Sequence, residues 1–225
     1  MQLIIFGSPG VGKGTLSDML SNKYKIPHIS TGDIFRNEIK SGNSELMQYV
    51  EKGLLVPDSV VNKVTENGLK QDRCKDGFIL DGYPRTIDQA EFLDNILWKL
   101  NKKMDIVLNL AASDTLVIER LSQRRVCGKC GATYNLITLK PKKKNVCDKC
   151  GSPLVQRQDD EPETVKKRIE VYRQETIQVI DYYKKKKILV DIDAAKKPKD
   201  VFNVIVKVVE DKFLDKTKKD SSNKK

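Results

Sequence analysis

Short apolar runs alternate with amphipathic segments along most of the chain. The first run, at 3–6, ends in a glycine-rich stretch, after which apolar positions in 16–20 recur at helical spacing. Similar runs at 78–80, 106–110 and 188–192 are each preceded or followed by a helical pattern of ten or more residues. Apolar strands that alternate with helices are typical of a parallel sheet covered on both faces. We therefore predict a three-layer α/β core.

Two segments break this alternation. Residues from about 30 to 58 are polar, have a helical pattern and lie between cap and turn signals, which predicts a small helical insert. Residues from about 122 to 160 hold four of the five cysteines without strand or helix periodicity, so we expect a second insert with its own means of stabilisation. The division that follows is a core at 1–29, 57–122 and 161–211, a helical insert at 30–56, a cysteine insert at 123–160 and a lysine-rich tail at 212–225 that we expect to be disordered.

Composition narrows the class of protein but does not identify it. The chain has 225 residues, enough for one or two domains with a substantial core, and a formal net charge of +11. No apolar run approaches the roughly 18 residues that a membrane-spanning helix needs, and the N-terminus lacks the features of a signal peptide, so we expect a cytoplasmic protein. The positive charge fits a nucleic-acid partner, an anionic substrate or a solvated lysine-rich surface equally well.

The glycine-rich stretch matches a phosphate-binding loop. Residues 7–13 fit the first seven positions of G-x-x-x-x-G-K-[ST], but Gly14 stands where serine or threonine is expected and Thr15 follows one place later. Glycines let successive backbone N–H groups converge on phosphate oxygens at the start of a helix, where the helix dipole also favours anions. Lys13 would add a positive charge at the β and γ phosphates. The motif follows a predicted strand and opens a predicted helix, which favours a nucleoside triphosphate site over an ordinary turn.

A carboxylate and several arginines extend this site. Asp81 ends the run at 78–80, where a carboxylate can hold magnesium or its waters beside the phosphates, and Arg85 follows four residues later. Further arginines lie in or next to both inserts, where closing of the inserts would bring them to the transferring phosphoryl group without a covalent intermediate. A single arginine is as well explained by a surface salt bridge, whereas the set is not; its members are Arg36, Arg85, Arg120, Arg124, Arg125, Arg157 and Arg168.

The cysteine insert carries the spacing of a metal site. Cys127, Cys130, Cys147 and Cys150 form C-x2-C-x16-C-x2-C, which is typical of a structural zinc site with four thiolates. Disulfides are the alternative, but a chain expected in a reducing compartment favours zinc. Cys74 is left over and is expected to be inert, and the lone His28 is expected to pack or bond locally.

Together these motifs resemble the adenylate kinase family in its long form with a zinc-binding lid. The resemblance runs from residue 1 to about 210, although residues 41–50 are about three shorter than is usual in the family. It is carried by residues 7–15, 30–33, 77–86 with Gln89, Arg124 with Arg125, and 159–161 before Arg168. The resemblance implies a monomeric enzyme of nucleotide biosynthesis that transfers phosphoryl from Mg-ATP to AMP to give two ADP. The helical insert would then be the nucleoside-monophosphate domain and the cysteine insert the lid over ATP.

The resemblance also implies a role for individual residues, with Gln89 reading the adenine edge of AMP through its amide. Catalytic residues would be Lys13, Arg85, Arg124, Arg157 and Arg168. Residues that hold ATP would be Gly10, Val11, Gly12, Lys13, Gly14, Thr15, Arg120, Arg124, Thr133, Tyr134 and Lys196, the last with a register uncertain by one. Residues that hold AMP would be Thr31, Arg36, Leu54, Leu55, Val56, Gly82, Tyr83, Pro84, Arg85, Gln89, Arg157 and Arg168. Thr15 and Asp81 would lie around magnesium, and Asp159 and Asp160 would match carboxylates of the lid hinge.

Two alternatives stay open at this point. The first is another nucleoside-monophosphate kinase, or a variant that takes GTP as donor, although Gln89 and Thr31 favour AMP as acceptor. The second is a zinc-ribbon protein that binds nucleic acid, for which the +11 charge and the cysteines argue. The basic runs lack interleaved aromatic residues, and the phosphate-binding loop is present, so the nucleic-acid alternative is the weaker one.

Overall fold

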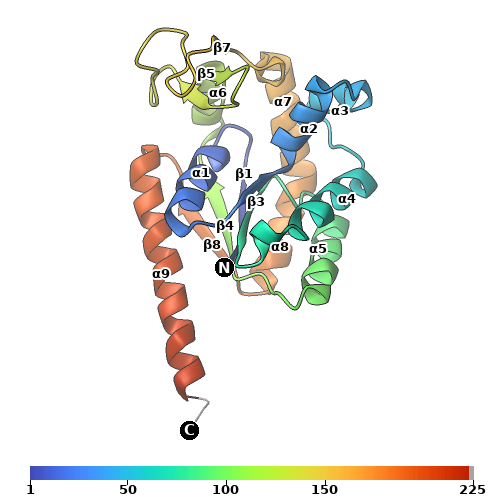
Figure 1. Ribbon diagram of the computed structural model, residues 1–225, viewed down its shortest axis with the longest axis vertical. Helices are drawn as coiled ribbons and strands as arrows, with labels where there is room; N and C mark the ends of the chain where they lie inside the picture. The colour runs from blue at the N-terminus through green and yellow to red at the C-terminus, as the bar shows by residue number, and fades with distance from the viewer. Residues whose placement is uncertain (223–225) are drawn as a thin grey trace.

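A five-stranded parallel sheet forms the centre of the molecule (Figure 1). The computed structural model describes residues 1–222, with side chains up to Phe213. The strand order is β2-β3-β1-β4-β8, with β1 at Gln2–Gly7, β2 at His28–Ser30, β3 at Phe78–Asp81, β4 at Ile106–Ala111 and β8 at Leu189–Asp193. All neighbouring pairs are parallel, which confirms the predicted α/β class.

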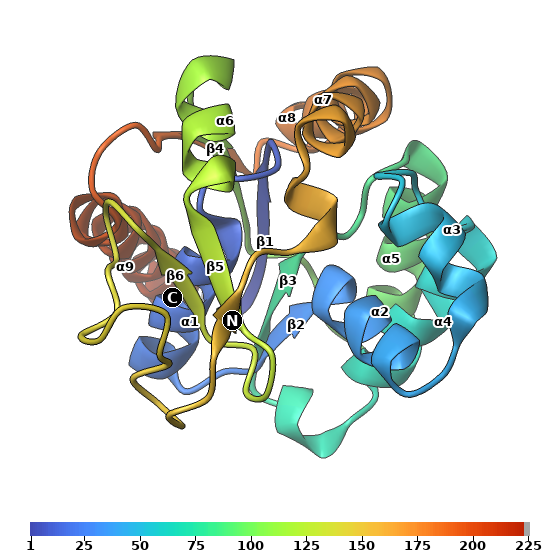
Figure 2. The same ribbon diagram turned by 90° about the horizontal axis from the view of Figure 1, so that it is seen from above.

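The sheet is apolar on both faces because side chains alternate along each strand. In β1, Ile4 and Phe6 belong to one core cluster, and Leu3 and Ile5 to the other. Helices α4 (Asp58–Leu69), α5 (Ile87–Lys99) and α8 (Ile177–Lys185) contribute to the first cluster. The second cluster includes residues of α1 (Lys13–Tyr24), α6 (Asp114–Ser122), α7 (Pro162–Val171) and α9 (Pro198–Ser222). The helices therefore cover both faces of the sheet, as Figure 2 shows from above.

The helical insert begins directly after β2. Ser30 caps α2 (Thr31–Lys40) by accepting a hydrogen bond from the Asp33 N–H, and α3 (Met47–Val50) follows a 3-10 turn at Ser44–Leu46. Phe35 and Leu46 are buried in the same cluster as Val56, so the insert packs onto the α4 side of the core. In Figure 1, α2 and α3 lie above α4, beside the cysteine insert.

The cysteine insert is a small antiparallel sheet in the order β6-β5-β7. Its strands are β5 at Arg124–Cys127, β6 at Thr133–Asn135 and β7 at Leu154–Val155. Four residues form its buried cluster, namely Cys127, Tyr134, Cys147 and Leu154. A cluster of this size stabilises little by apolar burial alone, so the insert needs a further source of stability.

Three local features differ from the sequence prediction or add to it. The three-residue strand β2 has no sequence signal because it is too short for a periodicity. A π-helical segment at Tyr172–Thr176 joins α7 to α8. The helical backbone of α9 continues through 212–222, where we expected disorder, and residues 223–225 lie outside the described part of the chain. Among the described helices, none combines the length and apolarity that crossing a bilayer requires.

Candidate functional site

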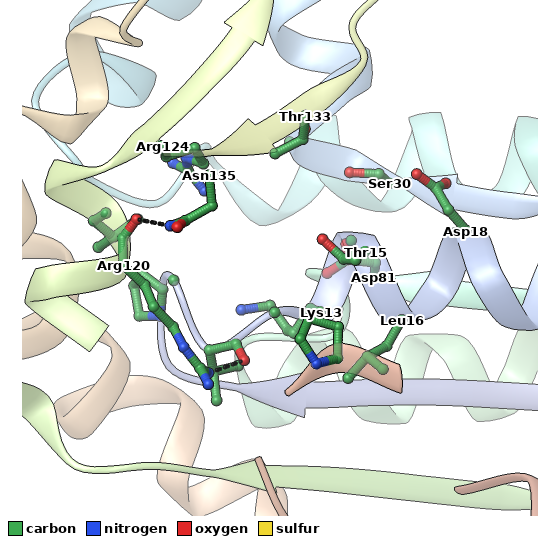
Figure 3. A pocket seen from close by; sticks show the side chains of 18 of the residues that line it. Lys13, Thr15, Leu16, Asp18, Ser30, Asp81, Arg120, Arg124, Thr133 and Asn135 are labelled. Atoms are coloured by element: carbon green, nitrogen blue, oxygen red, sulfur yellow. Dashed lines mark hydrogen bonds between the residues drawn. The ribbon is translucent and has the colours of Figure 1, made fainter. Parts of the chain in front are cut away.

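A cleft lies at the carboxyl edge of the sheet, beneath the cysteine insert. It has a volume of about 1340 Å³, partly open to solvent, and is lined by the phosphate-binding loop, the end of β3, the start of α2 and the cysteine insert. Parallel α/β sheets bind ligands at this edge because the loops that follow the strands converge there. Figure 3 shows Thr133 and Asn135 of the cysteine insert across the cleft from Lys13, Thr15 and Asp81.

The loop between β1 and α1 has the backbone that phosphate binding requires. Gly10 and Gly12 have φ angles of 82° and 113°, a region in which side chains other than glycine are strained. A Cβ at Gly10 would also lie 2.6 Å from Leu121 Cγ. The Lys13 ammonium donates hydrogen bonds to the carbonyls of Gly7 (2.7 Å) and Ser8 (3.0 Å), so the lysine folds over its own loop.

Burial changes the acid–base behaviour of Lys13. Desolvation lowers its pKa to about 7, and the cations of Arg85, Arg168 and Arg124 act in the same direction, while Asp81 opposes them. The charged form of Lys13 is therefore unfavourable in the free protein, and the negative charge of a nearby polyphosphate would offset this penalty.

Asp81 ends β3 between two cations. Burial by itself raises the pKa of Asp81, but His28 and Lys13 outweigh it, so the pKa lies below its usual value and the carboxylate is charged. His28 lies with Nδ1 2.9 Å from Asp18 Oδ1 and with Nε2 3.4 Å from Asp81 Oδ2. Burial lowers the pKa of His28, yet these two carboxylates raise it to about 10. His28 therefore bonds locally, as the sequence predicts: its ion pairs with Asp18 and Asp81 connect α1 to the end of β3.

The arginines converge on the cleft together with three aspartates. Arg124 donates from Nε to Asp160 Oδ2 at 2.7 Å, and Arg168 lies 3.0 Å from Asp159 Oδ2. Asp33 of α2 pairs with Arg36 at 2.5 Å and lies 3.8 Å from Arg157. The latter contact joins the helical insert to the residues that follow β7.

These arginines are held close to one another in a buried place. Burial, with Arg124 and Arg36, lowers the pKa of Arg157 to about 9, and burial is the main cause that lowers the pKa of Arg168 to about 10. Burial also lowers the pKa of Arg85. Positive charge therefore exceeds what the neighbouring carboxylates neutralise, which is the condition of a site that takes a highly charged anion.

Arg120 has a different position. Its guanidinium donates to the carbonyls of Val11 (3.0 Å), Ala194 (2.9 Å), Ala195 (3.1 Å) and Lys196 (3.2 Å). It thus joins the phosphate-binding loop to the segment between β8 and α9. Arg125 donates to the carbonyls of Ser122 and Arg124 and so supports the start of β5.

A second cavity of about 560 Å³ lies between the helical insert and the end of β3. Most of the residues expected to hold AMP line it, namely Thr31, Arg36, Leu54, Leu55, Val56, Gly82, Arg85, Gln89 and Arg168. Three others lie elsewhere: Arg157 lines the larger cleft, Pro84 lines a neighbouring cavity, and Tyr83 is buried with its hydroxyl donating to Asn62 Oδ1 at 2.7 Å.

The four cysteines of the insert lie close enough to bind one metal ion. Their sulfur atoms are all within 4.8 Å of one another, and all are free thiols. Cys127 Sγ lies 3.4 Å from Cys150 Sγ, and Cys130 Sγ lies 3.5 Å from Cys147 Sγ. These separations exceed a disulfide bond by far and approach the roughly 3.8 Å between thiolates arranged as a tetrahedron around zinc.

Thr133 and Tyr134, expected to contact ATP, both line the cleft. The Tyr134 hydroxyl, however, accepts a hydrogen bond from the Asp148 N–H at 2.7 Å and lies 3.5 Å from Cys147 Sγ. The polar end of Tyr134 therefore supports the cysteine cluster. Sequence reasoning missed several cleft residues that belong to no motif, including Asp18, Asn135 and Leu139.

Together, the parallel α/β core, the phosphate-binding loop and the buried arginines define a nucleotide phosphotransferase of the P-loop class. Comparison with known proteins identifies the family. A sequence model of the adenylate kinase family, described as "Adenylate kinase", matches residues 5–188. The chain therefore belongs to the adenylate kinase family.

Curated relatives agree with this assignment over most of their length. The chain is 49% identical to an adenylate kinase of Caldanaerobacter subterraneus over 213 residues, which is 93% of this chain and 96% of that one. It is 49% identical to an adenylate kinase of Caldicellulosiruptor saccharolyticus over 193 residues, 84% of this chain and 90% of the relative. It is 48% identical to an adenylate kinase of Archaeoglobus fulgidus over 213 residues, 93% of this chain and 98% of the relative.

The lowered pKa of Lys13 predicts that Mg-ATP binding takes up a proton. At pH 8.5, Lys13 is mostly neutral in the free protein because its pKa is about 7, and the phosphates of ATP favour its charged form. Binding should therefore take up a proton, and affinity should fall as the pH rises above 7. Calorimetric titrations in buffers of different ionisation enthalpy measure this uptake. Lys13→Met should remove most of this uptake, whereas Lys142→Gln, at an exposed lysine of the cysteine insert, should leave it unchanged. Equal uptake by Lys13→Met would refute the assignment.

Proposed function

We propose that this chain catalyses reversible in-line phosphoryl transfer from ATP to AMP, giving two ADP, through two cavities that meet at its buried arginines. The family assigns the reaction, and the observation that carries the proposal is the arginine cluster between the two cavities. Arg36, Arg85 and Arg168 line both cavities. A phosphate in either cavity would thus meet the same cations.

In this proposal the larger cleft holds ATP. The loop residues Gly10 to Thr15 bind the phosphates through their N–H groups, and Lys13 moves from its own loop carbonyls to the β and γ phosphates. Arg120 holds the segment around Lys196 against the loop, so that both flank the adenine. Thr133 and Tyr134 cover the nucleotide from the lid.

The second cavity holds AMP. Thr31 donates to the Gly82 carbonyl at 3.0 Å, and Arg85 Nε donates to the same carbonyl at 2.9 Å, so the end of β3 and the helical insert meet at one point. Arg36 and Arg85 then face the AMP phosphate, while Gln89 and the backbone at 54–56 face the base. Tyr83 and Pro84 shape this loop from behind, and Arg157 acts from the side of the cleft.

Catalysis in this site is positioning and electrostatic stabilisation. Lys13, Arg85, Arg124, Arg157 and Arg168 surround the place where the γ-phosphoryl would pass, and each can donate hydrogen bonds to its oxygens. Residues 30–56 act as the AMP domain and 123–160 as the lid. Closing of both excludes water that would otherwise hydrolyse ATP. The Asp33 contact with Arg157 joins the two inserts in the closed arrangement.

Magnesium fits the same cleft. Thr15 and Asp81 both line this cleft (Figure 3), and a hydroxyl and a charged carboxylate are the oxygen donors that this ion prefers. When bound, magnesium neutralises charge on the ATP phosphates. Asp81 is kept charged for this role by His28 and Lys13.

The cysteine cluster fits a structural zinc ion. Four thiols within 4.8 Å of one another can fill all four positions of a tetrahedral zinc ion and leave none for a substrate. Tyr134 and backbone groups outweigh burial and lower the pKa of Cys147 to about 6. The cytoplasm, where we expect this protein, is a reducing compartment that would keep such thiolates from forming disulfides. One chain lines both cavities, which supports a monomer.

Removal of the Lys13 charge should reduce catalysis strongly. We expect Lys13→Ala to lower kcat by about a hundredfold or more, because the transition state loses a preorganised cation. A coupled assay of ADP formation from ATP and AMP measures the rate, with Lys142→Ala as a matched lid control. Near-normal turnover of Lys13→Ala would contradict its role. Faster turnover with GTP than with ATP would favour a different donor.

Removal of the metal should destabilise the lid without removing a catalytic group. The purified protein should contain about one zinc per chain, and a chelator should lower its melting temperature. Cys127→Ser should behave like the chelated protein, whereas Cys74→Ser should keep its metal because Cys74 lies in the core, away from the cluster. Metal analysis combined with scanning calorimetry tests this, and an unchanged melting temperature after complete loss of zinc would refute it.

A further inference from the structure

Gln89 is held in a single orientation by two fixed partners. Its Oε1 accepts a hydrogen bond from the backbone N–H of Arg85 at 2.7 Å, and its Nε2 donates to Asp58 Oδ1 at 2.6 Å. The Arg85 N–H can only donate and a carboxylate can only accept. If the Gln89 amide were turned by 180°, its NH2 group would face the Arg85 N–H and its oxygen would face the Asp58 carboxylate. The side chain is 1% exposed, so water does not relieve either mismatch.

Asp58 itself is fixed at the start of α4. Its second oxygen, Oδ2, accepts a hydrogen bond from Thr86 Oγ1 at 2.8 Å. Thr86 caps α5 by accepting from the Gln89 N–H, so α4 and α5 are tied together around this one carboxylate. Asp58 is not among the residues that line the second cavity, whereas Gln89 is. The carboxylate therefore acts on a ligand through Gln89.

We propose that Asp58 is a positioning residue that makes the AMP site select adenine, by fixing which end of the Gln89 amide presents the oxygen and which the nitrogen. This inference rests on the proposed function, in which Gln89 faces the base of AMP. After its two internal hydrogen bonds, the amide retains one N–H at Nε2 and one lone pair at Oε1. The free N–H and the free lone pair together match a base edge that presents one acceptor and one donor in a fixed order.

The order of groups distinguishes adenine from the 6-oxo purines. Adenine presents an acceptor at N1 and a donor at its 6-amino group, which pair with Nε2 and Oε1 respectively. Hypoxanthine and guanine present a donor at N1 and an acceptor at O6, so they pair only with the turned amide. An unrestrained glutamine would adapt to either edge. With Asp58 in place, a 6-oxo purine leaves buried polar groups mismatched, which costs more than a lost contact.

The test compares AMP with IMP as acceptors, because these two nucleotides differ at position 6 and N1 alone. Asp58→Asn keeps the shape of the side chain but can donate as well as accept, so it removes one of the two constraints on the Gln89 amide and leaves the Arg85 N–H as the other. We expect the ratio of kcat/KM for AMP to that for IMP to fall about tenfold in Asp58→Asn, the effect of losing one charge-assisted hydrogen bond. The change should appear in the KM of the acceptor, with the KM for ATP unchanged.

Two further variants separate positioning from stability. Asp58→Ala should lower the same ratio, whereas Asp200→Asn, which removes a first-turn carboxylate from α9, should leave the ratio unchanged. Partial unfolding reduces turnover of both acceptors alike, so the ratio remains informative even where the melting temperature falls. An unchanged ratio in both Asp58 variants would overturn the assignment of Asp58 while the proposed function stands. Failure of the wild-type protein to phosphorylate AMP would instead overturn the proposed function, and the inference with it.

Discussion

The structure depends on positive charge that is buried before any ligand is considered. Lys13 and five arginines, Arg36, Arg85, Arg124, Arg157 and Arg168, converge on one cleft, where four carboxylates neutralise them in part: Asp33, Asp81, Asp159 and Asp160. Like charges at close range in a desolvated place are costly, as the lowered pKa values of Lys13, Arg157 and Arg168 indicate. In the proposed function, the phosphates of ATP and AMP supply the missing negative charge.

Two of these charged side chains, Lys13 and Asp81, are held in place by rigid parts of the fold. Lys13 stands at the start of α1 and Asp81 at the end of β3, both fixed by a sheet that is apolar on its two faces. Arg124 and Arg157 belong to the cysteine insert, whose own apolar cluster is small, and Arg168 lies on α7, which follows it. A zinc ion would give that insert the rigidity that its core lacks. The metal site would thereby help to hold the arginines of the insert close to the other cations of the cleft.

Much of this arrangement could be predicted from the sequence, because it rests on local spacing. The phosphate-binding loop, the four cysteines and the strand that ends at Asp81 each lie within a short segment, and the structure confirms the parallel α/β core and the cysteine cluster. The strand β2 is too short to leave a pattern. The hydrogen bond of Asp58 to Gln89 joins residues 31 positions apart, and no motif marks either its geometry or the four carbonyls that hold Arg120.

The central claim is that the buried cations stabilise the transferring phosphoryl group more than they stabilise the bound nucleotides. The rate of a single turnover of ATP and AMP on Arg168→Met, measured by rapid quench together with the dissociation constants of both nucleotides, tests this directly. We expect the rate of phosphoryl transfer to fall by about a hundredfold or more while the dissociation constants change by less than about tenfold. A transfer rate close to that of the wild-type protein, or a loss confined to nucleotide affinity, would contradict the claim.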